Sequence, residues 1–187
     1  ALELHTPMAR AADIESPTMV VFDLDPGPGT TITQCCEVAL WIRDTVSGVG
    51  LDCVAKTSGS KGLQVYLPLN TPHSHEHTSS FALAVAQVLE RAHPDLVVTN
   101  QARAARQDRV LIDWSQNSRH KTTICAYSLR ARPTPTVSTP VTWAEVRAGA
   151  EGELLSFDAA QVLTRVSEFG DLFAPAATLS QRLPGPR

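Results

Sequence analysis

The chain has 187 residues, of which 43% are apolar and 19% charged, and its formal net charge is −3. This length is typical of one domain, and the apolar share is too high and the net charge too small for a disordered chain. The apolar runs are far shorter than the roughly 20 residues of a membrane span, and the first residues lack a signal-peptide pattern. We therefore expect a soluble cytoplasmic domain with no membrane partner.

Strands and helices alternate along the sequence. In chain order we expect strands at 2–5 and 19–25, a helix from Thr31 or Thr33 to about residue 49, strands at 52–57 and 63–67, a helix at 76–91, strands at 96–98, 110–113 and 122–127, a Pro/Thr-rich loop at 133–140, and helices at 143–147 and 157–169. This order predicts a mixed α/β fold in which a sheet carries helices on one face. Residues 1–175 form the expected core, and residues 176–187 are expected to be a loose tail.

The cysteines and histidines do not have the spacing of a zinc site. The four cysteines form no Cys-x-x-Cys pair, so we expect reduced thiols in the core. The run His73-x-His75-x-His77 could hold a metal if it were a strand, since alternate residues of a strand share a face. A solvated loop before the next helix is the alternative.

Charge is distributed unevenly along the chain. Residues 1–50 hold seven acids and two bases, whereas residues 99–132 hold seven bases and two acids. Such a chain can hold cations at its acidic segment and phosphates at its basic segment. An ordinary solvated surface is the alternative, and charge alone does not decide between the two.

Three acids at strand ends provide the strongest chemical signal. Asp23 and Asp25 are two residues apart on one predicted strand, so both carboxylates lie on the same face. Asp113 ends a second apolar strand, and the three carboxylates converge if the two strands are neighbours. Their mutual repulsion then needs a cation, and hard ions such as Mg²⁺ or Mn²⁺ prefer oxygen ligands. Alternatively, Asp25 starts the Pro-Gly turn and Asp113 bonds local backbone.

The loop Ser58-Gly59-Ser60-Lys61-Gly62 is a second candidate site. Its hydroxyls, flexible backbone N–H groups and ammonium can bind phosphate oxygens. It is not a Walker A loop, because a strand rather than a helix follows it, and a plain turn is the alternative. Combined with the acids and the basic segment, this loop favours phosphoryl transfer, in which two metal ions hold the attacking and leaving oxygens.

Four segments together carry a resemblance to a known family: Phe22-Asp23-Leu24-Asp25-Pro26-Gly27, Thr57-Ser58-Gly59-Ser60-Lys61-Gly62-Leu63, Asp113-Trp114-Ser115-Gln116-Asn117 with Lys121-Thr122-Thr123, and Ala126-Tyr127-Ser128-Leu129-Arg130-Ala131-Arg132-Pro133. In collinear order over about residues 1–173, the chain resembles the polymerase domain of bacterial DNA ligase D. That domain belongs to the archaeo-eukaryotic primase superfamily and extends DNA ends in non-homologous end joining. The resemblance implies an α+β primase-like catalytic core, with a mixed, largely antiparallel sheet bearing the acids on one face and helices behind it.

The resemblance also implies roles for individual residues. Asp23 and Asp25 would bind both catalytic metals, Mn²⁺ or Mg²⁺, and Asp113 would bind the metal that activates the primer 3′-hydroxyl. The nucleotide would be contacted by His5, Ser58, Lys61, Gln64, Gln116 and Arg130, and the nucleic acid by Arg103 and Arg106. The implied partners are an NTP or dNTP, a DNA primer-template or DNA end, a DNA ligase and a Ku-type end-binding protein, at the nucleoid of a bacterial cytoplasm.

Two features depart from the family pattern. Gln64 stands where the family usually has a histidine near the phosphates, and glutamine cannot carry a charge near neutral pH. The chain also begins about one third of the way into the family domain, whose preceding part holds the template in relatives. A natural minimal version and a fragment are the two interpretations.

Three functions compete on this basis. The first is a nucleotidyltransferase that adds nucleotides to a primer end. The second is a catalytically weak or inactive remnant that binds nucleotide or DNA. The third is a haloacid-dehalogenase-type phosphatase, since an apolar-Asp-x-Asp strand also opens that fold, although such enzymes usually continue with Gly-Thr where this chain has Pro26-Gly27. We favour the first.

Overall fold

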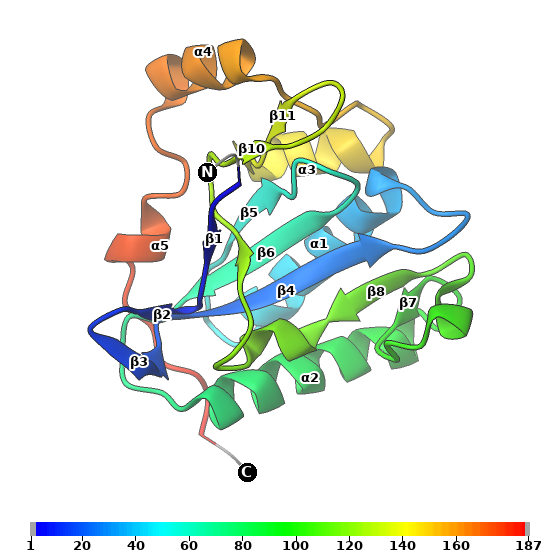
Figure 1. Cartoon of the computed structure of the whole chain (residues 1–187). Helices are drawn as coiled ribbons and strands as arrows, with labels where there is room; N and C mark the ends of the chain where they lie inside the picture. The colour runs from blue at the N-terminus through cyan, green and yellow to red at the C-terminus, as the bar shows by residue number, and fades with distance from the viewer. Residues whose placement is uncertain (1–2, 186–187) are drawn as a thin grey trace.

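A six-stranded sheet in the order β12-β5-β6-β4-β8-β7 forms the centre of the molecule (Figure 1). The computed structural model describes residues 3–185. The sheet strands are β4 (Met19–Pro26), β5 (Val54–Thr57), β6 (Leu63–Pro68), β7 (Val97–Val98), β8 (Val110–Asp113) and β12 (Pro140–Val141). All neighbours are antiparallel except β7 and β8, which are parallel. The expected mixed, largely antiparallel sheet is confirmed.

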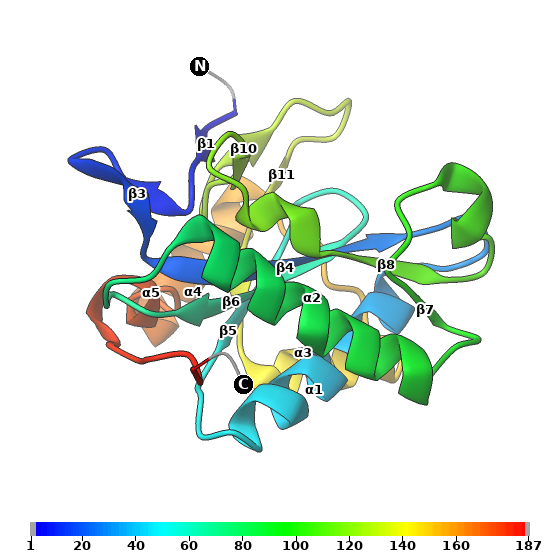
Figure 2. The same ribbon diagram turned by 90° about the horizontal axis from the view of Figure 1, so that it is seen from below.

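Three helices cover one face of this sheet (Figure 2). They are α1 (Ile32–Ser47), α2 (His75–Ala92) and α3 (Trp143–Ala150), and their apolar side chains form one core cluster with the sheet. Thr31 caps α1 in a capping box with Gln34, which satisfies backbone N–H groups at the start of the helix. Within the described part of the chain, none of the helices combines the length and apolar character needed to span a membrane.

Alternation along β4 separates the helix-covered face of the sheet from the open face. Val20, Phe22 and Leu24 are fully buried in the core on the helix side. Because successive side chains of a strand point to opposite faces, Asp23 and Asp25 lie on the other side. The sheet therefore buries its apolar residues beneath the helices and presents its carboxylates on the open face.

Short elements border the open face. They are β1 (His5–Thr6) paired with β9 (Thr123–Ile124), β2 (Ala9–Arg10) paired with β3 (Asp13–Pro17), β10 (Leu129–Arg130) paired with β11 (Thr136–Val137), the 3-10 helices η1 (Arg103–Arg106) and η2 (Trp114–Asn117), and the helices α4 (Ala159–Phe169) and α5 (Pro175–Thr178). Figure 1 shows β1 and β9 crossing in front of the sheet and α4 lying at one end of the molecule.

Two expected strand and loop boundaries were wrong. The strand expected at 122–127 is paired only at Thr123–Ile124, because the chain turns at Tyr127, whose φ of 65° is incompatible with a strand. The loop expected at 133–140 contains β11 and leads into β12, whose first residue is Pro140. Proline is tolerated at the start of an edge strand, where its missing N–H interrupts no ladder. The bounds of the strand expected at 2–5 were also wrong, because residues 3 and 4 are not in a strand and β1 is His5–Thr6; residue 2 lies outside the described residues.

The histidine run adopts neither of the two conformations considered for it. His75 and His77 lie in the first turn of α2, and Ser74 caps that helix by accepting from the backbone N–H of His77 at 3.1 Å. His73 precedes the cap, and its Nδ1 lies 3.3 Å from Nδ1 of His77. Because the serine cap starts the helix at His75, the three histidines do not lie on one face of a strand.

The segment expected to be a loose tail is folded onto the sheet through residue 185. Asn70 Nδ2 donates to two backbone carbonyls of this segment, at 3.1 and 2.8 Å. Gln181 Nε2 donates to the carbonyl of Pro68 at 2.7 Å, and Leu183 is buried in the main core. These polar pairs and the buried leucine attach the segment to the end of β6, so the expectation was wrong for residues 176–185.

Asn117 takes the place of a strand neighbour where β8 ends. β8 pairs with β4 only from Asp23 to Pro26. Beyond that point, Asn117 Nδ2 donates to the carbonyl oxygen of Val21 and its Oδ1 accepts from the Val21 N–H, both at 2.8 Å. Buried backbone groups need such partners, and this pair also holds η2 and the preceding Asp113 against β4.

We predict that Asn117→Ala lowers the free energy of unfolding by about 2–4 kcal/mol, because it leaves two buried backbone groups unpaired. Urea denaturation measures this change. The matched control is Gln87→Ala at an exposed amide of α2, for which we expect a change within about 0.5 kcal/mol. Equal losses in the two variants would contradict the assigned role of Asn117.

Candidate active site

The three predicted carboxylates lie on neighbouring strands of the open face. Asp23 of β4 is the direct register partner of Asp113 of β8. Directly opposed antiparallel residues have Cα atoms about 4.5–5.5 Å apart, which places the two side chains beside each other. Asp25 is two residues further along β4 and therefore points to the same face. The backbone register alone thus groups the three acids.

Burial and mutual repulsion raise the pKa of the two β4 carboxyls. Loss of hydration, followed by the charge of Asp25, raises the pKa of Asp23 to about 7, against a hydrogen bond from Gln64 and the charge of Lys56. For Asp25 the pKa is also raised, by loss of hydration and then by Asp113, while Arg106 opposes the shift. Without a cation, Asp23 therefore holds its proton below about pH 7, and ionising Asp25 is harder than in water.

Hydrogen bonds turn the Asp113 carboxylate toward its own loop. Oδ1 accepts from the backbone N–H of Ser115 at 3.0 Å and from Gln101 Nε2 at 3.1 Å, and Oδ2 accepts from Gln116 Nε2 at 3.1 Å. Among residues 3–185, no three Asp, Glu, His or Cys side chains are arranged as a ready-made metal centre. The acids fit Mg²⁺ or Mn²⁺ by oxygen type and by backbone register, and their side chains would have to turn to share an ion.

A cavity of about 400 Å³, the inner cavity, is lined by Asp23 and Asp25 but not by Asp113, and most of the residues predicted to contact a nucleotide line it. Its wall includes Asp23 and Asp25 from β4, Gln64 from β6 and the hairpin loop between β5 and β6. Of the residues expected to contact a nucleotide, those that line it are His5, Ser58, Lys61, Gln64 and Arg130. Cationic and carboxylate side chains therefore surround the same space, as a metal-bound triphosphate requires.

Close backbone contacts determine the shape of the hairpin loop. A Cβ at Gly62 would lie 2.2 Å from the carbonyl oxygen of Leu24, so only glycine lets the loop approach β4 this closely. The Ser58 hydroxyl accepts from the backbone N–H groups of Ser60 and Gly62, at 3.2 and 3.1 Å. These contacts place the loop directly beside the end of β4, where Asp25 lies.

Arg130 is held at the cavity by an ion pair that the sequence did not indicate. Its Nε donates to Glu3 Oε1 at 3.0 Å, and its NH1 donates to the carbonyl of Ser58 at 2.6 Å. Hydrogen bonds from the Ala131 backbone N–H and from Arg130 lower the pKa of Glu3 to about 2, so its carboxylate is ionised at neutral pH. Glu3 thus joins the N-terminal segment to β10 and orients the guanidinium.

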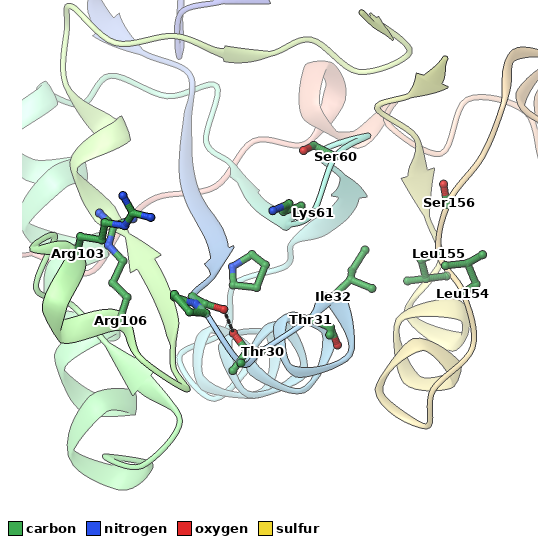
Figure 3. Close-up of a pocket in the computed structure, with 14 residues that line it drawn as sticks. Thr30, Thr31, Ile32, Ser60, Lys61, Arg103, Arg106, Leu154, Leu155 and Ser156 are labelled. Carbon is green, nitrogen blue, oxygen red and sulfur yellow. Dashed lines mark hydrogen bonds between the residues drawn. The ribbon is translucent and has the colours of Figure 1, made fainter. Parts of the chain in front are cut away.

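A second cavity, of about 900 Å³, opens beside the first and shares Lys61 and Arg106 with it (Figure 3). Arg103 and Arg106 lie on one side of it, and Ser60 and Lys61 face them from the hairpin loop. We call this second cavity the outer cavity. Arg103 lines the outer cavity and not the first one, whereas Arg106 lines both. The N-terminus of α1 forms its floor near Thr31, so this opening carries positive charge.

Three residues near the site do not line the inner cavity: Gln116, which was predicted, and Gln101 and Lys56, which were not. Gln116 does not line either of the two cavities and instead donates to Asp113. Gln101 donates to the same carboxylate, although no motif marked it. Lys56 on β5 is only 1% exposed, and burial lowers its pKa to about 7 while the charge of Asp23 opposes this. Lys56 could have been noticed in the sequence, because it is a charged residue within an otherwise apolar strand, two residues before Ser58.

Comparison with known proteins places this geometry in a family. The sequence profile described as LigD, primase-polymerase domain, matches residues 1–173. The chain belongs to this family. It is also similar to the solved polymerase domain of Mycobacterium tuberculosis ligase D in complex with DNA, with a TM-score of 0.86 and 42% identity over 97% of this chain and 65% of that one. The phosphatase interpretation is therefore not favoured.

Whole LigD proteins are much longer than this chain. The multifunctional non-homologous end joining protein LigD of Mycolicibacterium smegmatis is 47% identical over 177 residues, which cover 94% of this chain and 23% of that protein. The bifunctional non-homologous end joining protein LigD of Bacillus subtilis is 30% identical over 171 residues, which cover 91% and 28%. The chain thus spans about a quarter of the curated relatives it matches.

We predict that Asp23→Asn stabilises the metal-free protein near pH 8 by about 2 kcal/mol, allowing for solvent screening. Folding raises the pKa of Asp23 from 3.8 to about 7. Between these values the folded state keeps a proton that the unfolded state has lost, so the free energy of unfolding falls as pH rises through this window. Asparagine does not titrate, so the variant should not lose this part of the free energy of unfolding as pH rises.

Urea denaturation with a chelator present, near pH 8 and near pH 4, measures the gain. The two proteins should differ near pH 8 and converge near pH 4, where Asp23 is protonated in the folded wild type. A variant that is no more stable than wild type near pH 8 would show that Asp23 carries no such electrostatic cost.

Proposed function

We propose that this chain transfers nucleotides onto the 3′ ends of DNA primers. One observation carries the proposal: Asp23 lines a cavity together with Ser58, Lys61 and Arg130, and Asp113 is its register partner on the neighbouring strand. Paired carboxylates next to phosphate-binding groups are the arrangement that phosphoryl-transfer chemistry needs. Membership of the LigD primase-polymerase family supports the same reaction.

In the inner cavity, the cationic side chains would bind the triphosphate and the carboxylates would bind the metal ions. Lys61 and Arg130 would hold the triphosphate, with the Ser58 hydroxyl and the Gln64 amide as further hydrogen-bond partners. His5 lies on the rim of the same cavity, from β1. These contacts would orient the α-phosphate toward the primer hydroxyl and so reduce the entropic cost of bringing the two together.

Asp23, Asp25 and Asp113 would hold two divalent ions, Mn²⁺ or Mg²⁺. When bound, such ions neutralise the triphosphate and activate the primer hydroxyl for attack. Gln101 and Gln116 would orient the Asp113 carboxylate through their hydrogen bonds to its two oxygens. Such outer partners fix the direction in which a carboxylate presents its remaining lone pairs.

The outer cavity would receive the DNA. Arg103 is exposed there, and Arg106 lies between the two cavities, so both can reach backbone phosphates. The solved relative, the Mycobacterium tuberculosis ligase D polymerase domain, is in complex with DNA, which supports this assignment. From the names of the relatives we infer a place in non-homologous end joining. A DNA ligase and a Ku-type protein as partners, at the bacterial nucleoid, are what the family resemblance adds to this proposal.

A binding module without turnover is the competing function. Gln64 favours it, because a neutral amide stands where the family usually has a histidine near the phosphates. Such a module would bind nucleotide and DNA through Lys61 and Arg130 but would form no extended primer. Both functions predict binding, so only product formation separates them.

We predict that the wild type extends a labelled primer with Mn²⁺ and ribonucleotides, and that Asp113→Asn lowers the rate at least a hundredfold, because a catalytic charge is lost. The matched control is Asp95→Asn, which makes the same charge change at an exposed turn, and we expect it to retain wild-type activity. Gel-resolved primer extension measures both.

No extension by folded wild-type protein with either Mn²⁺ or Mg²⁺ would favour the binding module. Equal extension by wild type and Asp113→Asn would overturn the assigned role of the paired carboxylates. Circular dichroism on each variant shows whether the protein under test is folded.

A further inference from the structure

A row of polar side chains crosses three strands on the open face. Lys56 of β5 is the register partner of Gln64 of β6, and Gln64 is the register partner of Asp23 of β4. Lys56 and Gln64 are 1% and 3% exposed. The row therefore runs from a buried ammonium, through a buried amide, to a candidate metal ligand.

The buried ammonium has polar partners but no direct ion pair. Among residues 3–185, no carboxylate lies within 4.0 Å of Lys56 Nζ. Instead, Nζ donates to Gln64 Oε1 at 2.5 Å and to Ser138 Oγ at 2.7 Å. Burying a charged group is costly, so this placement needs a reason that core packing does not provide.

The side-chain oxygen of Gln64 accepts two hydrogen bonds, both from residues other than Asp23. Besides Lys56, the Tyr66 hydroxyl donates to the same Oε1 at 3.1 Å, and Tyr66 is itself hydrogen-bonded to Thr123 Oγ1 at 2.8 Å. In its protonated form the lysine has only donors, and together with the Tyr66 hydroxyl it fixes the oxygen as the amide atom on this side. The amide nitrogen then points the other way, on the side of the register partner Asp23, whose pKa Gln64 lowers.

This arrangement makes a glutamine act as a donor only. A free glutamine amide can turn over and present either its oxygen or its N–H groups. An oxygen facing Asp23 and the phosphates would meet like charge, whereas an N–H group donates a charge-assisted hydrogen bond. Gln64 lines the inner cavity, so the amide orientation decides which of the two a bound triphosphate meets.

We propose that Lys56 and Tyr66 are positioning residues that lock the Gln64 amide with its N–H groups toward Asp23 and the triphosphate of the incoming nucleotide. The inference rests on the proposed function, because the ligand is the nucleotide of that reaction. It explains how this chain uses a neutral amide at the position near the phosphates. Neither positioning residue lines the inner cavity.

A double-mutant cycle tests the proposal through equilibrium binding of a fluorescent ribonucleoside triphosphate with Mn²⁺. We expect Lys56→Met to weaken binding about tenfold, the effect of losing one charge-assisted hydrogen bond. In a Gln64→Ala background the same substitution should change binding less than twofold, because no amide remains to be oriented. Arg147→Met, which removes a cation outside both cavities, controls for net charge.

Equal losses from Lys56→Met in both backgrounds would overturn the proposal, because the lysine would then act by charge or folding alone. Thermal unfolding checks that each variant is folded. Tyr66→Phe is the second variant, should Lys56→Met fail to fold. It removes one hydroxyl only, and we expect about threefold weaker binding with Gln64 present and no change without it.

A nuclear magnetic resonance measurement separates this proposal from the proposed function. In metal-free, nucleotide-free protein, the side-chain amide protons of Gln64 should exchange slowly with solvent, and at least tenfold faster in Lys56→Met or Tyr66→Phe. Slow exchange in wild type without primer extension would support the locked amide while the proposed function fails. Unchanged exchange in a folded variant would overturn the lock, whatever the activity.

Discussion

Folding buries the carboxyl of Asp23 beside those of Asp25 and Asp113, and the cost of ionising it there is the constraint on which the rest of the site depends. Folding brings them together because the alternate residues of β4 are needed in the core beneath the helices. The acids cannot move away without moving Phe22 and Leu24 out of that core. The site therefore holds an electrostatic cost that a bound cation would remove, and the groups around the acids can be understood in relation to it.

Three groups of side chains respond to that charge. Gln101 and Gln116 hydrogen-bond the Asp113 carboxylate, and Gln64, the register partner of Asp23, lowers the pKa of that carboxyl. Beyond them, cations at the hairpin loop and on β10 line the same cavity and are suited to the opposite partner, an anionic triphosphate. One cavity thus has acids that suit metal ions on β4 and cations that suit phosphates on the hairpin loop and β10. For this reason a metal-bound nucleotide is the ligand that we propose.

Much of the fold and part of the site could be predicted from the sequence, because their signals are local. The period-two pattern of β4 identified a strand with Asp23 and Asp25 on one face, and the Gly-rich loop identified a hairpin. The edge strand beginning at Pro140 was missed, since proline in a Pro/Thr-rich stretch resembles a loop until its partner β5 is known. Lys56 was missed for the same reason, because burial of a lysine depends on strands that are distant in the sequence.

Binding of Mn²⁺ by the three carboxylates is the central claim, and electron paramagnetic resonance titration of Mn²⁺ into the protein measures it directly. The account predicts that wild type binds the ion and that replacing Asp23 and Asp113 by asparagine weakens this binding at least tenfold. Equal Mn²⁺ binding by the folded double variant and by wild type would contradict it.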